Sequence, residues 1–346
     1  MLYASTRSKT ETYTAQRTLW QDRATDGGFF VPLKLPVFKR TEIIKLKNRA
    51  PEDNLALILN KFFRTEFSGK ELQFAIGRDY YKLVPIRQKM LLAELWHNPE
   101  GELDRIVRTL IRKISTEPRD GEPGEWPRMA VRIGLLFAIF GELADRGEVS
   151  TIYPMDLAVP AGDFSWPMAA WYARKMGLPI GTIVCASCDN DRIRDLLHRG
   201  QIRLEVGMRP SFAAKYDCGV PAGLERFIYT LLGREEVQEF IRKQESGGIY
   251  AVNPEQRRLL AEGMYVSVNN SSRLADTIPN AFRTFGHVLC PYGALVYTGV
   301  LDHQFITGKY NKVMMLTEFS PEHSLEAIAR TMGITAAELR KRLNLE

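Results

Sequence analysis

Two cysteines, Cys185 and Cys188, are separated by two residues, and this spacing supplies half of the ligands of a structural zinc site. A complete site needs two further ligands at comparable spacing. The remaining cysteines, Cys218 and Cys290, stand singly, without Cys or His partners at ligand spacing. The sequence therefore predicts no metal site. It predicts reduced thiols, of which the first pair packs at the end of a strand.

A histidine and a carboxylate form a second candidate group that could exchange protons with a substrate. His97 follows an aromatic residue at the edge of an Asn-Pro turn, and Asp104 lies farther along the chain. Histidine titrates near neutral pH and is the commonest general acid or base. A histidine in such a turn is more often a structural hydrogen-bonding group. Asp104 beside Arg105 is typical of a solvated helix face, so the structural interpretation of both is favoured.

The elements that would position these residues alternate between strand and helix. Two short apolar runs, residues 157–160 and 180–185, are typical of buried strands. Each is followed by a helical pattern, at residues 166–176 and 192–198. This alternation favours an α/β fold with a mostly parallel sheet, because parallel strands need crossover helices.

The rest of the chain adds helices and one charged connection. After an extended start at residues 2–7, glycines at 27–28 predict a turn before a short strand that Pro32 ends. Residues 115–124 are charged and rich in Pro and Gly, which predicts a loop and an internal junction. Thr335 is a favourable N-cap for the last helix. Further helices are predicted at residues 53–63, 103–114, 127–146, 322–332 and 336–343.

Composition excludes several classes of protein. A chain of 346 residues with 45% hydrophobic and 25% charged residues can bury a large core, so disorder is not expected. The 47 Lys and Arg against 41 Asp and Glu give a formal charge of +6, but the basic residues are scattered, so no nucleic-acid partner is expected. The longest apolar stretch, residues 133–140, is too short to cross a bilayer. The polar start lacks a signal-peptide core, and we expect a cytoplasmic protein without a membrane partner.

Seven short segments occur in an order that is informative for the whole chain. They are Ser5-Thr6-Arg7 and residues 26–32, 95–99, 159–164, 172–180, 189–191 and 224–226. Together they resemble the threonine synthase family, which belongs to the fold-type II enzymes that use pyridoxal phosphate (PLP). The resemblance implies an N-terminal α/β segment at residues 1–90 and a truncated tryptophan synthase β-like domain at residues 91–346.

The position of the cofactor lysine departs from this family, whose activity is a PLP-dependent reaction of O-phosphohomoserine. In the family a lysine lies seven residues after the histidine that corresponds to His97, and Asp104 occupies that position here. The chemistry requires an amine that forms an imine with the cofactor, and a carboxylate cannot do so. Lys113 is the nearest lysine, about two and a half helical turns away. We therefore expect that PLP is not bound.

The counterpart of the family's phosphate-binding loop has also changed. Such a loop works through backbone N–H groups and glycines that allow close approach, without negative charge nearby. Asp163 and Ser165 stand where the family has an asparagine and a second glycine, and the next helix begins with Trp and with Pro, which has no N–H. We expect a phosphate to be repelled here. The loop consists of Ala161, Gly162, Asp163, Phe164 and Ser165.

Two further positions of the family's site are identified by the resemblance. Tyr292 stands where the family has a histidine, which is another loss. Thr317 corresponds to the residue that contacts the pyridine nitrogen. Without the rest of the site, we expect Thr317 to be a strand residue with a local hydrogen bond.

The small lobe of the family fold is also expected to be absent. The family's Ser-Gly-Asp-Thr-Gly loop has no counterpart, and residues 115–124 lead directly into Glu125-Trp126-Pro127-Arg128, which resembles the stretch after that lobe. The loss should leave apolar surface that is repacked or buried in an oligomer. We expect a homo-oligomer, most simply a two-fold dimer. Its expected aromatic anchors are Trp126, Trp166 and Trp171.

Three functions are compatible with these residues. The first is a threonine synthase-like protein without PLP-dependent catalysis, with a binding, regulatory or assembly role. The second is a PLP-independent enzyme or small-anion binder that uses the old cleft. The third and weakest is threonine synthase activity, which would need a lysine from elsewhere. The second would draw on His97, Asp104, Asp163 and Arg226.

Overall fold

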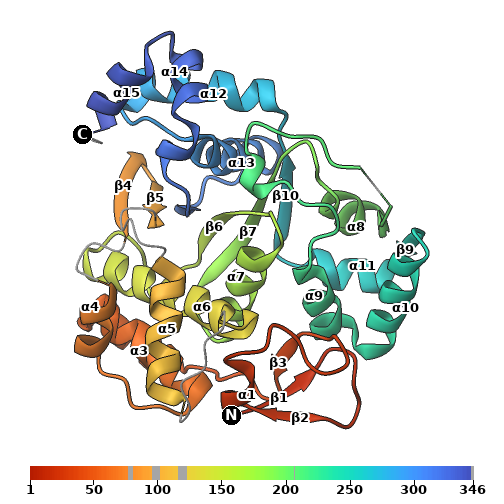
Figure 1. Ribbon diagram of the computed structural model, residues 1–346. Helices are drawn as coiled ribbons and strands as arrows, with labels where there is room; N and C mark the ends of the chain where they lie inside the picture. Colours follow the sequence, from red (N-terminus) through yellow and green to blue (C-terminus); the bar gives the residue numbers. More distant parts are fainter. Residues whose placement is uncertain (77–80, 96–101, 116–122, 206, 344–346) are drawn as a thin grey trace.

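A six-stranded sheet forms the centre of the fold (Figure 1). In order across the sheet, its strands are β10 (Met264–Val268), β7 (Ile180–Ser187), β6 (Met155–Pro160), β11 (Val313–Thr317), β5 (Met90–Glu94) and β4 (Lys82–Arg87). All neighbouring strands are parallel except β5 and β4, which confirms the predicted α/β fold with a mostly parallel sheet. The computed structural model describes residues 1–76, 81–95, 102–115, 123–205 and 207–343.

Both faces of this sheet are buried, because successive residues of the central strands enter two different cores. In β6, Leu157 and Val159 belong to one core and Ala158 belongs to the other. In β7, Ile183 and Val184 divide in the same way. This two-sided burial explains why the strands read as continuous apolar runs rather than as alternating patterns.

Helices cover each face of the sheet. Helix α13 (Pro291–Thr307) packs along β6, β7, β10 and β11, and α7 (Ser165–Lys175) packs on the opposite face of β6 and β7. The approach of α13 is close at Gly299, where a Cβ atom would lie 3.1 Å from the Cβ of Ala186. A larger residue at Gly299 would push the helix away from the strand.

Helix α6 (Glu125–Asp145) connects the helix layer that contains α7 with the N-terminal half of the chain. It packs against α7 and against α3 (Pro51–Phe63). A Cβ at Gly134 of α6 would lie 2.5 Å from Cδ1 of Leu55, so a larger residue there would force the Leu55 side chain to move. The predicted helices at 53–63 and 127–146 are thus confirmed to within two residues of their ends.

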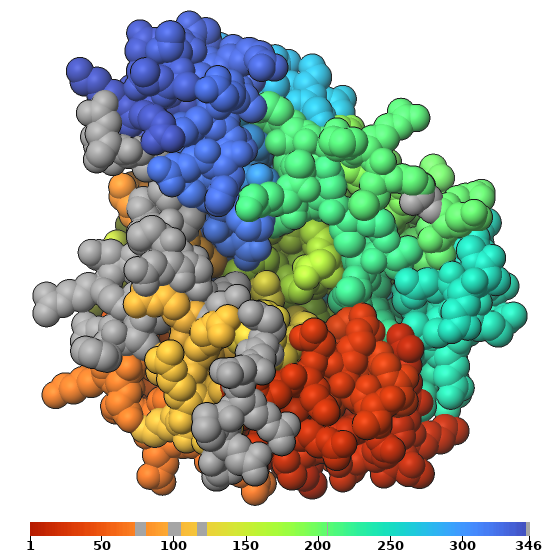
Figure 2. Space-filling view, in the orientation of Figure 1, coloured from red at the N-terminus to blue at the C-terminus, as the bar shows by residue number. Residues whose placement is uncertain are grey.

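The N-terminus forms a separate antiparallel sheet. Its order is β2 (Thr12–Thr14), β1 (Leu2–Ser5), β3 (Phe30–Pro32), in agreement with the predicted extended start and glycine turn. Figure 2 shows this segment (red) seated against the teal region that contains α9 (Gly223–Leu232) and α10 (Arg234–Glu245).

The remaining elements agree with the sequence pattern where it predicted them. Thr335 caps the last helix, because its Oγ1 accepts a hydrogen bond from the N–H of Glu338 at 3.2 Å and its own N–H donates to Glu338 Oε2 at 2.8 Å. These elements are α1 (Ala15–Thr18), α2 (Arg40–Ile44), α4 (Gly69–Ile76), α5 (Glu102–Ile114), α8 (Ile193–Arg199), β8 (Gln201–Arg203), β9 (Ile249–Ala251), α11 (Pro254–Ala261), α12 (Ser271–Phe285), α14 (Leu325–Met332), α15 (Ala336–Leu343), and the 3-10 turns Lys45–Asn48, Ala214–Tyr216 and Pro321–Ser324.

Two expectations about organisation stay predictions. Helix α5 ends at Ile114 and α6 begins at Glu125, but residues 116–122 of the expected direct connection lie outside the described residues. The expected division at residue 90 coincides with the first residue of β5, and β4 pairs with β5 across it. Among the described residues, the helices are all too short or too polar to pass through a membrane.

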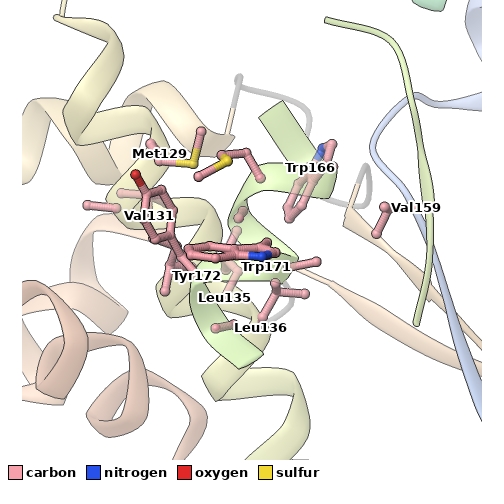
Figure 3. Packing of buried hydrophobic residues seen from close by; sticks show 14 of the residues in the cluster. Met129, Val131, Leu135, Leu136, Val159, Trp166, Trp171 and Tyr172 are labelled. Carbon is pink, nitrogen blue, oxygen red and sulfur yellow. The ribbon is translucent and has the colours of Figure 1, made fainter. Parts of the chain in front are cut away.

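The three tryptophans expected at a dimer interface are buried inside one chain instead. Trp126, Trp166 and Trp171 are 0%, 3% and 7% exposed. Trp126 is enclosed by the rings of Tyr3 and Phe62, at centroid distances of 5.2 and 5.4 Å. Figure 3 shows the other two on α7, among side chains of α6. Their role as interface anchors was therefore predicted wrongly, because α6 and α7 pack around them.

Candidate functional site

A short loop follows β6 at the carboxyl edge of the parallel sheet, which is where α/β folds bind ligands. Gly162 has φ 40°, and Phe164 has φ 70°, in the left-handed region that costs a non-glycine residue about 1 kcal/mol. Phe164 is held there because its ring is fully buried, 5.1 Å from the ring of Phe227. The loop is thus fixed by packing before any ligand is considered.

The backbone N–H groups of this loop are largely used within the protein. The N–H of Ala161 donates to the carbonyl of Ala186 at 2.7 Å, and the N–H of Phe164 donates to the carbonyl of Ala161 at 2.7 Å. The carboxylate of Asp163 accepts from the N–H of Ser165 at 2.9 Å and from its hydroxyl at 2.7 Å. The start of α7, which would attract a bound anion, already has one in Asp163.

An aromatic cluster, formed by Tyr216, Tyr292 and Phe319, lies against the loop. A Cβ on Gly162 would lie 3.3 Å from the ring of Tyr216. The ring centroids are 5.3 Å apart for Tyr216 and Tyr292, 5.1 Å for Tyr216 and Phe319, and 5.0 Å for Tyr292 and Phe319. The three rings therefore contact one another and leave no gap between them for another ring. Burial raises the pKa of Tyr216 and Tyr292, so both hydroxyls stay protonated at neutral pH.

Thr317 ends β11 beside this cluster, as the predicted strand residue. Its hydroxyl oxygen lies 3.9 Å from the Sγ of Cys290, and that sulfur also accepts a hydrogen bond from the N–H of Gly293 at 3.3 Å. Cys290 thereby caps the start of α13. Burial raises the pKa of the Cys290 thiol to about 11, so it is neutral near pH 7 and unsuited to nucleophilic attack.

A second thiol at the same edge is also kept protonated. Cys188 follows β7, and its thiol donates to a carboxylate oxygen of Asp217 at 3.1 Å. Ser211 donates its hydroxyl to Cys188 Sγ at 3.3 Å, and Asn190 donates to Asp217 at 2.7 Å. Burial raises the pKa of Cys188 to about 11. The expected strand-end packing of this cysteine is observed, and the network ties two loops together.

One pair at this edge was missed by sequence reasoning. Glu94 is the last residue of β5, directly beside Thr317 in the sheet, and its carboxylate is buried. Its Oε1 lies 2.8 Å from Nε2 of His287. The available signal was a carboxylate directly after the apolar run 90–93, since a charged residue at the end of a buried strand needs a partner.

Of the remaining predicted site residues, only the side chain of Arg226 is described, and it is engaged by other groups. Arg226 pairs with Glu125, with Nη1 3.1 Å from Oε1, and its Nε donates to the carbonyl of Phe30 at 3.2 Å. It therefore ties α9 to α6 and to the N-terminal sheet. Asp104 lies in α5, but its side chain and all of His97 are outside the described residues.

Parts of the sequence are similar to known proteins. A family model described as "Threonine synthase N terminus" matches residues 2–80. The human protein "Threonine synthase-like 1" is 24% identical over 173 residues, which are 49% of this chain and 23% of that protein. Threonine synthase of Methylobacillus glycogenes is 29% identical over 133 residues, 37% of this chain and 27% of the enzyme. The matches thus span only about a quarter of these relatives.

Solved structures resemble nearly the whole chain. PLP-bound threonine synthase from Brucella melitensis superposes with a TM-score of 0.85 at 16% identity, over 96% of this chain and 92% of that one. Threonine synthase from yeast gives 0.80 at 16% identity, over 100% and 94%. Identity at this level is informative about the fold alone.

Proposed function

We propose that this chain is a threonine synthase-like protein that carries out no PLP-dependent catalysis and acts through binding, regulation or assembly. The match of its N-terminal residues and the likeness of its fold support the family part of this proposal. The observation that carries the proposal is the hydrogen bonding of the Asp163 carboxylate to Ser165 at the start of α7. That carboxylate takes the N–H and the hydroxyl that a phosphate would need.

The residues present do not fit PLP in two further respects. Tyr216 lies on Gly162, so a cofactor ring beside the loop would have to displace a buried tyrosine. Asp104 stands at the position of the lysine, and a carboxylate cannot form the imine that holds the cofactor. These residues therefore do not support a step of PLP chemistry in this chain.

The alternatives have less support from the same residues. Asp163 opposes anion binding at the loop after β6, since two negative charges about 4 Å apart repel by about 4 kcal/mol at an intermediate dielectric. An enzyme with a cysteine nucleophile would need an activated thiol, and burial raises the pKa of both Cys188 and Cys290 to about 11. Threonine synthase activity would need an amine that reaches the cleft from another lysine.

The test is stoichiometric cofactor capture. The purified protein is mixed with PLP, reduced with borohydride and digested, and the modified lysines are located by mass spectrometry. We expect scattered, substoichiometric labelling of surface lysines and no absorption band of a bound cofactor. The PLP-binding threonine synthase of Brucella melitensis serves as the positive control. Labelling of one lysine at one equivalent per chain would overturn the proposal.

A further inference from the structure

A groove separate from the cleft lies between the N-terminal sheet and helices α7, α9 and α10; we call it the β3 groove. Its volume is about 450 Å³, within the size range of pockets that bind small organic molecules. Leu33 and Leu35, which follow β3, line it together with Trp171 and Tyr229. Arg234 and Glu235 stand at the start of α10, on its rim.

Arg234 is the group that points to a ligand. Its guanidinium lies 5.8 Å from the centroid of the Tyr229 ring. Within the ranges that the structure describes, Arg234 forms no ion pair, and its buried Nε atom has no hydrogen-bond partner. The residue is partly exposed and its charge has no ion-pair partner there, so a negatively charged group in the groove would gain an ion pair with its guanidinium. Arg226, in contrast, is already paired with Glu125.

The aromatic and apolar lining of the groove determines which kind of ligand body it can bind. Trp171 and Tyr172 stand side by side on α7, with their rings 5.6 Å apart (Figure 3), and together with Tyr229 they give the groove an aromatic floor. The side chain of Leu33 is 54% exposed at the opening. An apolar or aromatic group placed there would be removed from water on both sides.

The charges around the groove restrict the head group. The ammonium of Lys175 lies 5.4 Å from the Trp171 ring, which adds positive charge near the floor. Glu235, next to Arg234, is 3.6 Å from Lys9, so its negative charge is balanced by that lysine. The planar guanidinium of Arg234 matches a carboxylate.

We propose that the β3 groove binds a small monocarboxylate with an aromatic or branched aliphatic body. The β3 groove uses none of the residues of the loop after β6 or of the aromatic cluster beside it, so the proposal does not depend on the function proposed above. Arg234 would hold the carboxylate, and the aromatic floor would hold the body.

The proposal is tested by titration calorimetry on the full chain. The probes are 3-phenylpropionate and 4-methylpentanoate. The comparison compound is 3-phenylpropanamide, which lacks the charge. We expect saturable binding of both carboxylates to one site, with binding of the amide at least about tenfold weaker. Absence of saturable carboxylate binding, or equal binding of amide and carboxylate, would overturn the proposal.

Variants locate the binding. Arg234→Gln should weaken 3-phenylpropionate about tenfold or more. The matched control is Arg242→Gln on the same helix, where the arginine is paired with Glu239 outside the groove. Leu33→Glu, at an exposed position, should also weaken binding by placing a negative charge at the opening. Thermal unfolding of each variant verifies the fold. Unchanged affinity in both Arg234→Gln and Leu33→Glu would show that the ligand binds elsewhere.

Discussion

At the scale of single residues, Asp163 takes the place that a bound anion has in a phosphate-binding loop. Its carboxylate satisfies the N–H at the start of α7 and lies near the positive end of the helix dipole. An aspartate that repels a ligand can therefore stabilise the protein itself.

Removal of this carboxylate should cost stability and create a need for an anion. We expect Asp163→Ala to lower the free energy of unfolding by about 1 kcal/mol, which is typical of a lost capping group. Inorganic phosphate should restore part of this loss, because it can accept the freed N–H of Ser165. Urea unfolding with and without phosphate gives both values.

The control for that measurement is Asp276→Ala, an exposed carboxylate on α12. Its change should stay within about 0.5 kcal/mol, as is usual for surface substitutions, and phosphate should have no specific effect. Equal stability of Asp163→Ala and Asp276→Ala would contradict the capping role.

At the scale of elements, the ion pair of Arg226 and Glu125 joins three parts of the fold. Arg226 is 1% exposed, and its guanidinium also lies 4.8 Å from the Phe29 ring. A buried charge that loses its partner is costly, whereas removal of both charges is less so. We expect Glu125→Gln to lower the free energy of unfolding by about 3 kcal/mol. Urea denaturation of this variant and of Glu125→Gln with Arg226→Met should show partial recovery in the double variant.

The contact between α13 and the sheet should be sensitive to acid through His303. This side chain is buried between Tyr265, with rings 5.1 Å apart, and Asp156, with Nδ1 3.9 Å from Oδ2. Burial lowers the pKa of His303, with a smaller opposing effect of Asp156. The unfolded chain therefore binds a proton more readily than the folded chain below about pH 6.5, and stability falls as the pH falls through that range.

We expect His303→Asn to show a smaller loss of unfolding free energy than the parent protein between about pH 7 and about pH 5.5. His198→Asn, at an exposed position, serves as the control and should keep the full pH dependence. Parallel urea titrations at several pH values provide the comparison. An identical pH profile for the parent and His303→Asn would show that other groups cause the acid sensitivity.

At the scale of the whole molecule, a homodimer remains our expectation, but its surface must differ from the one first predicted. The tryptophans are inside the chain, whereas Phe305, Ile306 and Tyr310, at the end of α13 and just after it, are 83%, 68% and 61% exposed. Apolar side chains clustered in this way on one segment are typical of a contact surface. We expect a dimer at micromolar concentration in light scattering.

The same surface gives a variant that should separate the dimer. Phe305→Ser combined with Ile306→Ser should weaken association by at least about tenfold, because two exposed apolar side chains no longer leave water on association. Val37→Ser removes an equally exposed apolar side chain on another segment, and its dimer should persist. A monomer mass for the parent protein would contradict the expectation.

The sequence by itself determined those features that are local in the chain. The alternation of apolar runs and helical patterns predicted the parallel sheet, because burial on both faces makes every residue of such a strand apolar. The Thr335 cap was predictable because it is a local contact, in which donor and acceptor lie three residues apart. The interpretation of Asp104 and Asp163 as replacements of family residues also rests on the sequence alone, and it stays a prediction.

Only the tertiary structure decided what surrounds these positions. Tyr216, Tyr292 and Phe319 come from three separate segments, and no periodic pattern records that their rings meet beside Gly162. The pairing of Arg226 with Glu125 and the burial of the tryptophans depend equally on the way α6, α7 and α9 pack. Such contacts join residues far apart in the chain, so their energies depend on the packing of whole elements and leave no local trace in the order of residues.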